Sequence, residues 1–143
     1  MFLILIFLLL SMKDMTAALI IRGRKILLVH NIKHGELRIE PPGGKREAKE
    51  SLEECVIREA KEELGLTIQP IKIFGIFETK SPEGDFKVYM YFSEIKKGEP
   101  TIMEKDKISK FGWYSLEDMK KFKERGVLVP NLCSAFDNIK NYL

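Results

Sequence analysis

The sequence predicts an α/β (α+β) domain in which a mixed β-sheet is sandwiched between α-helices. Three observations favour this fold class. Short runs rich in β-branched and aliphatic residues open the chain, a long helical pattern follows them, and further extended runs precede two more helical segments. With 143 residues and no internal repeats, low-complexity tracts or linker-like stretches, the chain is expected to form one domain with its own core.

A hairpin and a short extended run are expected before the first helix. Residues 16–21 and 25–30 are β-branched-rich runs joined by Arg22-Gly23-Arg24, a pattern typical of a hairpin. The extended run at 37–40 stops at Pro41-Pro42-Gly43-Gly44, where a helix and a central strand are both unfavourable.

The first helix carries signals at both of its ends. Ser51 is an N-cap candidate with Glu54 three residues later, and Gly65 is placed to end the helix of residues 51–64 in the left-handed conformation. Two strands, a short strand and two helices are expected after it, at 71–79, 86–95, 111–114, 116–124 and 131–143.

The first eleven residues differ from the rest of the chain. Residues 2–10 are all apolar but too few to cross a bilayer, which needs ~20. A secretory signal would require basic residues at its start, but no Lys or Arg precedes Lys13. We therefore separate an apolar extension, 1–11, from a domain at 12–143. A misassigned start at one of the next two methionines is favoured, followed by an added strand or homodimer contact, and then by membrane association. Because an exposed apolar β-former aggregates, we expect the segment to pack against protein.

Composition limits the partners. The net charge of +3 and the pI near 8.8 suit a small anionic substrate. Lysines and arginines are spread along the chain rather than clustered with aromatic residues, so we expect neither nucleic acid nor membrane as a partner. Cys55 and Cys133 are too few for a disulfide framework and lack metal-binding spacing, which indicates reduced structural thiols in a cytoplasmic protein.

One segment combines glycines, glutamates and an arginine at fixed spacing. Gly44 is followed after five residues by Glu50, and after seven more by Arg58 and Glu59. The pattern ends with Ala60, Glu62, Glu63, Gly65 and Leu66.

Helical geometry distinguishes these glutamates from a solvated face, which is the usual role of a charged helix. At about 100° per residue, three acids continue the apolar stripe that Leu52, Cys55 and Val56 begin. These acids are Glu59, Glu62 and Glu63. Like charges on the inward half of a helix repel unless a cation binds them, and a hard divalent cation prefers clustered carboxylates.

The glycines before this helix have a physical role as well. Gly43 and Gly44 bring bare backbone close to the helix N-terminus, where a carbonyl can reach a metal and N–H groups can bind phosphate oxygens. Together with the carboxylates, this arrangement favours a metal-assisted attack on a diphosphate.

The pattern resembles the signature box of the Nudix hydrolases, and every fixed position of that box is met. The resemblance to small MutT-type members extends over nearly all of residues 12–143, through RIEPPGGK before the box and GEP and GWYSLEDM after it. It implies an α/β/α sandwich that hydrolyses a nucleoside diphosphate linked to another moiety. It also implies Mg²⁺ as cofactor, which Mn²⁺ can replace.

The resemblance assigns roles to individual residues. Glu59 is the expected general base, with Glu63 as the rival, while Arg58 holds the glutamates and Glu50 braces that network. The implied metal ligands are one backbone carbonyl and four acidic side chains: Gly43, Glu59, Glu62, Glu63 and Glu104. Glu104 enters this set because it lies four positions beyond a Gly-Glu-Pro.

The substrate is less well defined by the resemblance. Gly44 is expected at the phosphates, and Asn31, Pro41 and Asn131 correspond by position to base- and sugar-contacting sites. Asn31 replaces a basic residue and Pro41 an aromatic one. Phe77, Tyr89 and Trp113 are therefore the alternative candidates for an aromatic surface, although such residues are more often core.

We expect a MutT-type (d)NTP pyrophosphohydrolase that releases the monophosphate and pyrophosphate, with oxidised nucleotides such as 8-oxo-dGTP among the candidate substrates. Pro82, sixteen residues after the box, favours an ADP-ribose pyrophosphatase as the alternative, although a proline also suits the turn there. Gly84 stands where dinucleoside-polyphosphate hydrolases carry a tyrosine. A non-catalytic nucleotide sensor is the alternative of a different class, and it is disfavoured because such domains usually lose box glutamates.

Overall fold

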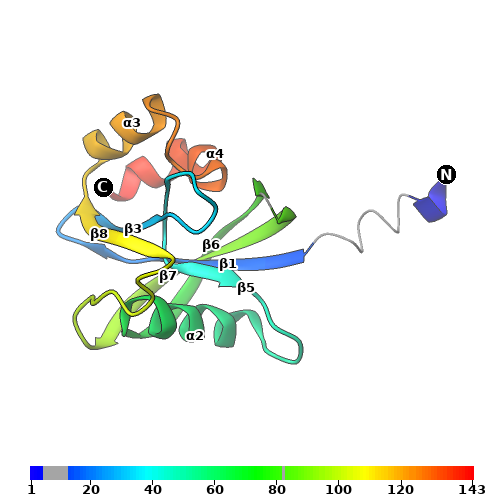
Figure 1. Cartoon of the computed structure of the whole chain (residues 1–143), viewed down its shortest axis with the longest axis horizontal. Coiled ribbons are helices and arrows are strands. Elements are labelled where there is room, and N and C mark those ends of the chain that lie inside the picture. The colour runs from blue at the N-terminus through cyan, green and yellow to red at the C-terminus, as the bar shows by residue number, and fades with distance from the viewer. Residues whose placement is uncertain (5–12, 82) are drawn as a thin grey trace.

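The computed structural model describes residues 1–4, 13–81 and 83–143. Two four-stranded sheets lie between α2 on one side and α3 and α4 on the other (Figure 1). The elements that precede β6 are β1 Lys13–Leu19, β2 Ile21–Arg22, β3 Lys25–Asn31, β4 Arg38–Glu40, β5 Gly43–Lys45 and α2 Leu52–Leu64. The remaining elements are β6 Thr67–Ser81, β7 Gly84–Lys97, β8 Ile108–Tyr114, α3 Leu116–Glu124, α4 Pro130–Ile139 and a 3₁₀ helix at Lys140–Tyr142. The predicted mixed sheet between helices is confirmed.

The first sheet has the order β5-β1-β7-β6, in which β1 and β7 are parallel and the other pairs antiparallel. In the second sheet β3 pairs with β2, β4 and β8, all antiparallel. β5 is an edge strand, which agrees with the expectation that the Pro-Pro-Gly-Gly segment could not form a central one.

The predicted hairpin is only partly correct. Gly23 and Arg24 have positive φ angles of 57° and 63°, and β2 pairs with β3 across this turn. The preceding run does not continue the hairpin, however, because β1 lies in the other sheet between β5 and β7. Local turn signals predicted the turn. They could not predict that the chain passes from one sheet to the other between β1 and β2, because this depends on which distant strands each segment pairs with.

Buried side chains on both faces of the strands explain why the helices divide between two sides. In β1, Ala17 and Leu19 pack in the cluster that contains Leu132 of α4, whereas Ala18 packs in the cluster that contains Val56 of α2. Successive side chains of β1 therefore point to opposite faces of the sheet and contribute to two hydrophobic layers, one under each set of helices.

The predicted capping box of α2 is present. Ser51 accepts a hydrogen bond from the backbone N–H of Glu54, whose side chain accepts one from the N–H of Ser51, and Gly65 ends α2 with a φ of 70°. Ser115 and Asp118 form the equivalent box at the start of α3. The final helix ends at Ile139 and continues as a 3₁₀ turn, rather than running to the last residue as expected.

Residues 1–4 are exposed, at a distance from the sheets (Figure 1). Most of the predicted apolar extension, residues 5–11, lies outside the described residues, so its packing and its role as a dimer contact stay predictions. Within the described ranges, no helix is both long and apolar enough to span a membrane.

Candidate active site

The loop between β4 and β5 delivers the two glycines to the side of α2. Gly43 and Gly44 pair with β1 through Ala17 and Thr16. A side chain at Gly44 would bring its Cβ within 2.6 Å of the Glu59 carboxylate carbon. A Cβ at Gly44 would therefore displace the Glu59 carboxylate from its position beside β5.

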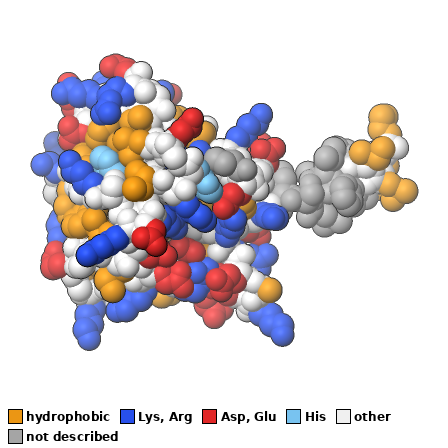
Figure 2. Space-filling model, in the orientation of Figure 1, with side chains coloured by type: hydrophobic (Ala, Val, Ile, Leu, Met, Phe, Trp, Pro, Cys, Tyr) orange, Lys and Arg blue, Asp and Glu red, His pale blue; other side chains and the backbone are white. Residues whose placement is uncertain are grey.

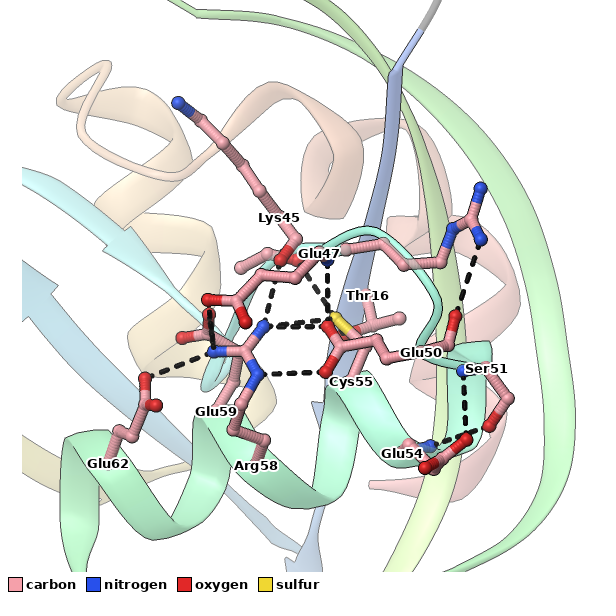
Figure 3. A network of polar contacts seen from close by, with 12 residues as sticks. Thr16, Lys45, Glu47, Glu50, Ser51, Glu54, Cys55, Arg58, Glu59 and Glu62 are labelled. Carbon is pink, nitrogen blue, oxygen red and sulfur yellow. Dashed lines mark hydrogen bonds and ion pairs between the residues drawn. The ribbon is translucent and has the colours of Figure 1, made fainter.

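Arg58 is the centre of a network of carboxylates (Figure 3). Its Nε and Nη2 donate to the two oxygens of Glu50 at 2.9 and 2.8 Å, which is bidentate geometry. Its Nη1 donates to Glu59 at 2.9 Å and to Glu62 at 3.1 Å, and Nη2 also donates to the carbonyl of Lys45 at 3.0 Å. The hydrogen bonds from Arg58 lower the pKa of Glu50 to about 2. The arginine thus ties the loop of β5 to two consecutive turns of α2.

Cys55 lies beneath this network as a buried thiol. Its sulfur is 3.2 Å from Thr16 Oγ1 and donates to the carbonyl of Gly44 at 3.6 Å. Burial raises the pKa of the thiol to about 11, which keeps it protonated and unreactive. Both Cys55 and Cys133 are free thiols, as expected for structural cysteines.

Glu63 is the most deeply buried acid of the site, with 1% of its side chain exposed. One carboxylate oxygen accepts the backbone N–H of Gly43 at 2.7 Å, and the other accepts Lys107 Nζ at 2.9 Å. Burial raises the pKa of Glu63 above its ordinary value, against the opposing effects of Lys107 and Gly43. Burial also raises the pKa of Glu59 above its ordinary value. These are carboxylates whose charged forms lack full compensation within the protein.

Glu104 lies in the loop that follows β7, and this loop contacts the end of α2. Backbone N–H groups of this loop donate to carbonyls at the end of α2, from Thr101 to Leu64 and from Met103 to Glu63. The Oε1 atom of Glu104 is buried and has no hydrogen-bond partner among the described residues. An unpartnered buried carboxylate oxygen beside other acids is a suitable metal ligand.

In the described ranges, His, Cys, Asp and Glu side chains form no group of three or more that is arranged to hold a metal ion. Internal cations hold the acids instead: Arg58 binds Glu59 and Glu62, and Lys107 binds Glu63. Glu62, expected on the inward half of the helix, lies at its edge with 49% of its side chain exposed. The buried acids, the orphan oxygen of Glu104 and the backbone of Gly43 nevertheless supply the oxygen donors that a divalent cation prefers.

A cavity of about 390 Å³ opens beside these acids. His34 lines it together with acidic and basic side chains, which are Lys33, Arg38, Glu40, Lys45, Arg46, Glu47, Glu59, Glu83 and Lys107. On the face seen in Figure 2, acidic side chains gather over α2 and lysine and arginine side chains lie next to them. Cations of this density suit a ligand that carries several phosphate groups.

A second cavity, of about 40 Å³, adjoins the first and shares Arg38, Glu40 and Gly43 with it. Pro41, Thr79 and Asn131 line it. Thr79 Oγ1 and Asn131 Oδ1 are buried without a hydrogen-bond partner among the described residues. Two orphan polar atoms facing one space indicate a polar ligand group rather than a structural void.

The structure separates the residues expected at the substrate. Asn31 lines the larger cavity, where its amide donates to Glu40 at 2.6 Å, while Pro41 and Asn131 line the smaller one. The aromatic candidates are partly buried and pack against the core instead: Phe77 against the layer beneath α4, and Tyr89 and Trp113 against the layer beneath α2.

Glu40, Thr79 and Lys107 were missed in the sequence. Glu40 and Thr79 are the last residues of expected extended runs and Lys107 lies in a polar loop, and none has a motif spacing that would distinguish it. Pro82 lies outside the described residues.

Comparison with known proteins gives consistent results. A family model described as "NUDIX domain" matches residues 12–132. An "8-oxo-dGTP diphosphatase" from Escherichia coli (strain K12) is 36% identical over 67 residues, which are 47% of this chain and 52% of that protein. The chain thus matches about half the length of the curated relatives.

Two solved structures illustrate the structural similarity. A "NUDIX hydrolase" from Nitrosomonas europaea has a TM-score of 0.79 at 20% identity, covering 92% of this chain and 90% of that one. An "ADP-ribose pyrophosphatase" from Streptococcus suis has a TM-score of 0.63 at 25% identity, covering 76% and 77%.

Proposed function

Since the chain belongs to the NUDIX domain family, we propose that it is a divalent-metal-dependent pyrophosphohydrolase that cleaves a nucleoside diphosphate linked to another moiety. One observation carries the proposal. The buried acids Glu59 and Glu63 lie on one helix beside a large cavity lined by five lysines and arginines and four glutamates. Buried carboxylates with raised pKa values next to an anion-binding space are the features expected of a metal-assisted phosphate site.

The residues divide between holding the metal and handling the water. Gly43, Glu59, Glu62, Glu63 and Glu104 are the proposed ligands. A bound Mg²⁺ or Mn²⁺ neutralises charge on the phosphate oxygens and lowers the pKa of a water molecule. Arg58 and Glu50 keep the glutamates in place through their hydrogen bonds.

Glu59 is the proposed general base. It lines the cavity, whereas both oxygens of Glu63 are already bound, by Gly43 and Lys107. Its raised pKa lies closer to neutral pH than that of an ordinary carboxylate, which favours proton acceptance. Glu59 takes a proton from the attacking water, an oxygen–phosphorus bond forms, and the anhydride P–O bond on the opposite side of that phosphorus breaks.

A (d)NTP is the proposed substrate, with the monophosphate and pyrophosphate as products. The larger cavity has room for phosphates, with Gly44 in its wall and lysines and arginines in its lining, and the small cavity offers Asn131 and Thr79 to a polar base. The relative named 8-oxo-dGTP diphosphatase supports an oxidised purine nucleotide as a candidate. The structural relative named ADP-ribose pyrophosphatase supports ADP-ribose as the second candidate, which would give AMP and ribose 5-phosphate.

The test is a hydrolysis screen with Mg²⁺ against dGTP, 8-oxo-dGTP, ATP, ADP-ribose and Ap4A. Each reaction is repeated with EDTA, with Glu59→Gln, and with Glu53→Gln as a matched control. Glu53 is exposed on the same helix. We expect EDTA to abolish turnover and Glu59→Gln to reduce it by about 10²–10⁴-fold, the usual contribution of a general base.

The products distinguish the candidates. Pyrophosphate from a triphosphate supports the (d)NTP assignment, and ribose 5-phosphate supports ADP-ribose. Full turnover by Glu59→Gln at saturating Mg²⁺ would transfer the role of general base to Glu63. Tight nucleotide binding without turnover of any substrate would favour a sensor.

A further inference from the structure

Lys107 is a buried cation that the signature box does not include. It lies just before β8, and 23% of its side chain is exposed. Its Nζ donates to Glu63 at 2.9 Å, and the charges of Glu59 and Glu104 also act on it. The same side chain lines the large cavity. Lys107 therefore contacts both the acids proposed to bind metal and the space proposed for substrate.

The backbone of Lys107 is held on both sides, so movement is confined to its side chain. Its N–H donates to the carbonyl of Glu104 at 3.1 Å, and its carbonyl accepts the N–H of Ile32 at 2.8 Å. A lysine side chain has a flexible four-carbon stem and one compact charge. The ammonium group can therefore exchange partners without any change in the loop.

Charge balance explains why a lysine is needed at this position. A carboxylate as buried as Glu63 is costly without a cation. Arg58 is occupied by Glu50, Glu59 and Glu62, so it does not serve Glu63. Within the described residues, Lys107 is the cation in contact with that carboxylate.

We propose that Lys107 is the internal counter-ion of Glu63 and competes with the divalent cation for this carboxylate. When the cation displaces it, the Lys107 side chain turns into the adjoining cavity and binds the phosphates of the substrate. Lys107 is thus a positioning residue in the metal-free protein and a phosphate-binding residue in the loaded one. The competition with metal is independent of catalysis, whereas the phosphate contact rests on the proposed function.

The first half is tested with Mn²⁺ alone, in the absence of nucleotide. Lys107→Met keeps the aliphatic stem and removes the charge, and Lys105→Met is the matched control, since Lys105 is an exposed lysine of the same loop. Mn²⁺ affinity is measured by electron paramagnetic resonance and calorimetry, and thermal unfolding is followed with and without Mn²⁺.

We expect Lys107→Met to bind Mn²⁺ about tenfold more tightly, the scale on which groups next to metal ligands alter metal affinity. Without metal, the variant should melt at a lower temperature than the parent, and Mn²⁺ should close the gap. Unchanged or weaker Mn²⁺ binding would overturn the competition. If Lys107→Met does not fold without metal, Lys107→Gln and Lys107→Arg are measured instead. The glutamine variant should show the tighter binding, and the arginine variant, which keeps the charge, should bind Mn²⁺ as the parent does.

The second half is tested by kinetics at saturating Mg²⁺ with the best substrate of the screen. We expect Lys107→Met to raise KM by about tenfold or more with a smaller change in kcat, because a phosphate contact is lost. An unchanged KM alongside tighter Mn²⁺ binding would overturn the phosphate contact and leave the counter-ion role. If no substrate is turned over, the proposed function fails, yet the Mn²⁺ and melting experiments still decide the competition.

Discussion

Arg58→Met is the substitution that tests the carboxylate network most directly. The guanidinium donates twice to Glu50 and once each to Glu59, Glu62 and the carbonyl of Lys45. Methionine retains the aliphatic body of the side chain but removes the charge and every one of these donors. The acids then remain close together without the cation that holds them.

The size of the effect follows from two contributions. Arg58 lowers the pKa of Glu50 from 4.5 to about 2, which corresponds to roughly 3 kcal/mol at about 1.36 kcal/mol per pKa unit. Because Glu50 lies near the surface, solvent screening reduces this contribution to about 1–2 kcal/mol. Loss of the charged hydrogen bond to the largely buried Glu59 adds about 1–2 kcal/mol. We expect a total destabilisation of about 2–4 kcal/mol at pH 7.

Urea unfolding of the parent and Arg58→Met at several pH values checks this number. The pKa of Glu50 is depressed in the folded state, so its contribution is present above about pH 4.5 and is lost as the pH falls toward 2. The difference between the two proteins should therefore narrow in acid. Lys61→Met, an exposed lysine on the same helix, is the control and should cost less than about 1 kcal/mol. Ordinary surface substitutions change the free energy of unfolding by about 0.5 kcal/mol or less. A change no larger than this for Arg58→Met, or a change that stays constant down to about pH 2.5, would refute the reasoning.

Three further predictions concern packing and the cavities. Gly44→Ala should lower kcat by about 10²-fold, because its Cβ would displace the Glu59 carboxylate; unchanged kinetics would mean that β5 can move away. Thr79→Val should stabilise the protein by about 1 kcal/mol in thermal unfolding, because it removes a buried hydroxyl without a partner, and it should weaken nucleotide binding in calorimetry. A loss of stability would show that the hydroxyl is satisfied in solution. Leu132→Ala should cost about 2–5 kcal/mol in urea unfolding, because the side chain is fully buried beneath α4, and a cost below 1 kcal/mol would contradict the packing described.

Features with a local physical cause could be predicted from the sequence. The capping boxes at Ser51 and Ser115 and the left-handed Gly65 depend on residues within one turn of each other. The inward position of Glu59 and Glu63 follows from helical periodicity alone. The predicted inward position of Glu62 was less accurate. Glu62 lies at the edge of the apolar stripe of α2, where its side chain is 49% exposed and accepts a hydrogen bond from Arg58.

The hairpin shows where local signals stop. The turn at Gly23 and Arg24 is as predicted, but the run before it divides between two sheets. β1 lies parallel to β7, more than sixty residues away in the sequence, with buried residues on both of its faces. A choice between two partners for an apolar strand depends on the packing of the whole domain.

The sequence by itself determined that this chain carries a carboxylate helix behind a glycine turn, because the spacing, the caps and the periodicity are all properties of one contiguous segment. Only the tertiary structure decided what surrounds that helix. Lys107 reaches Glu63 from the loop after β7, which also carries Glu104 and hydrogen-bonds to the end of α2. Asn131 and Pro41 line the same small cavity because the connector before α4 pairs with Ile39 of β4. The N–H of Ile39 donates to the carbonyl of Val127, and the carbonyl of Ile39 accepts the N–H of Val129. These contacts join segments far apart in the chain, and the burial of a shared core, rather than any local preference, brings them together.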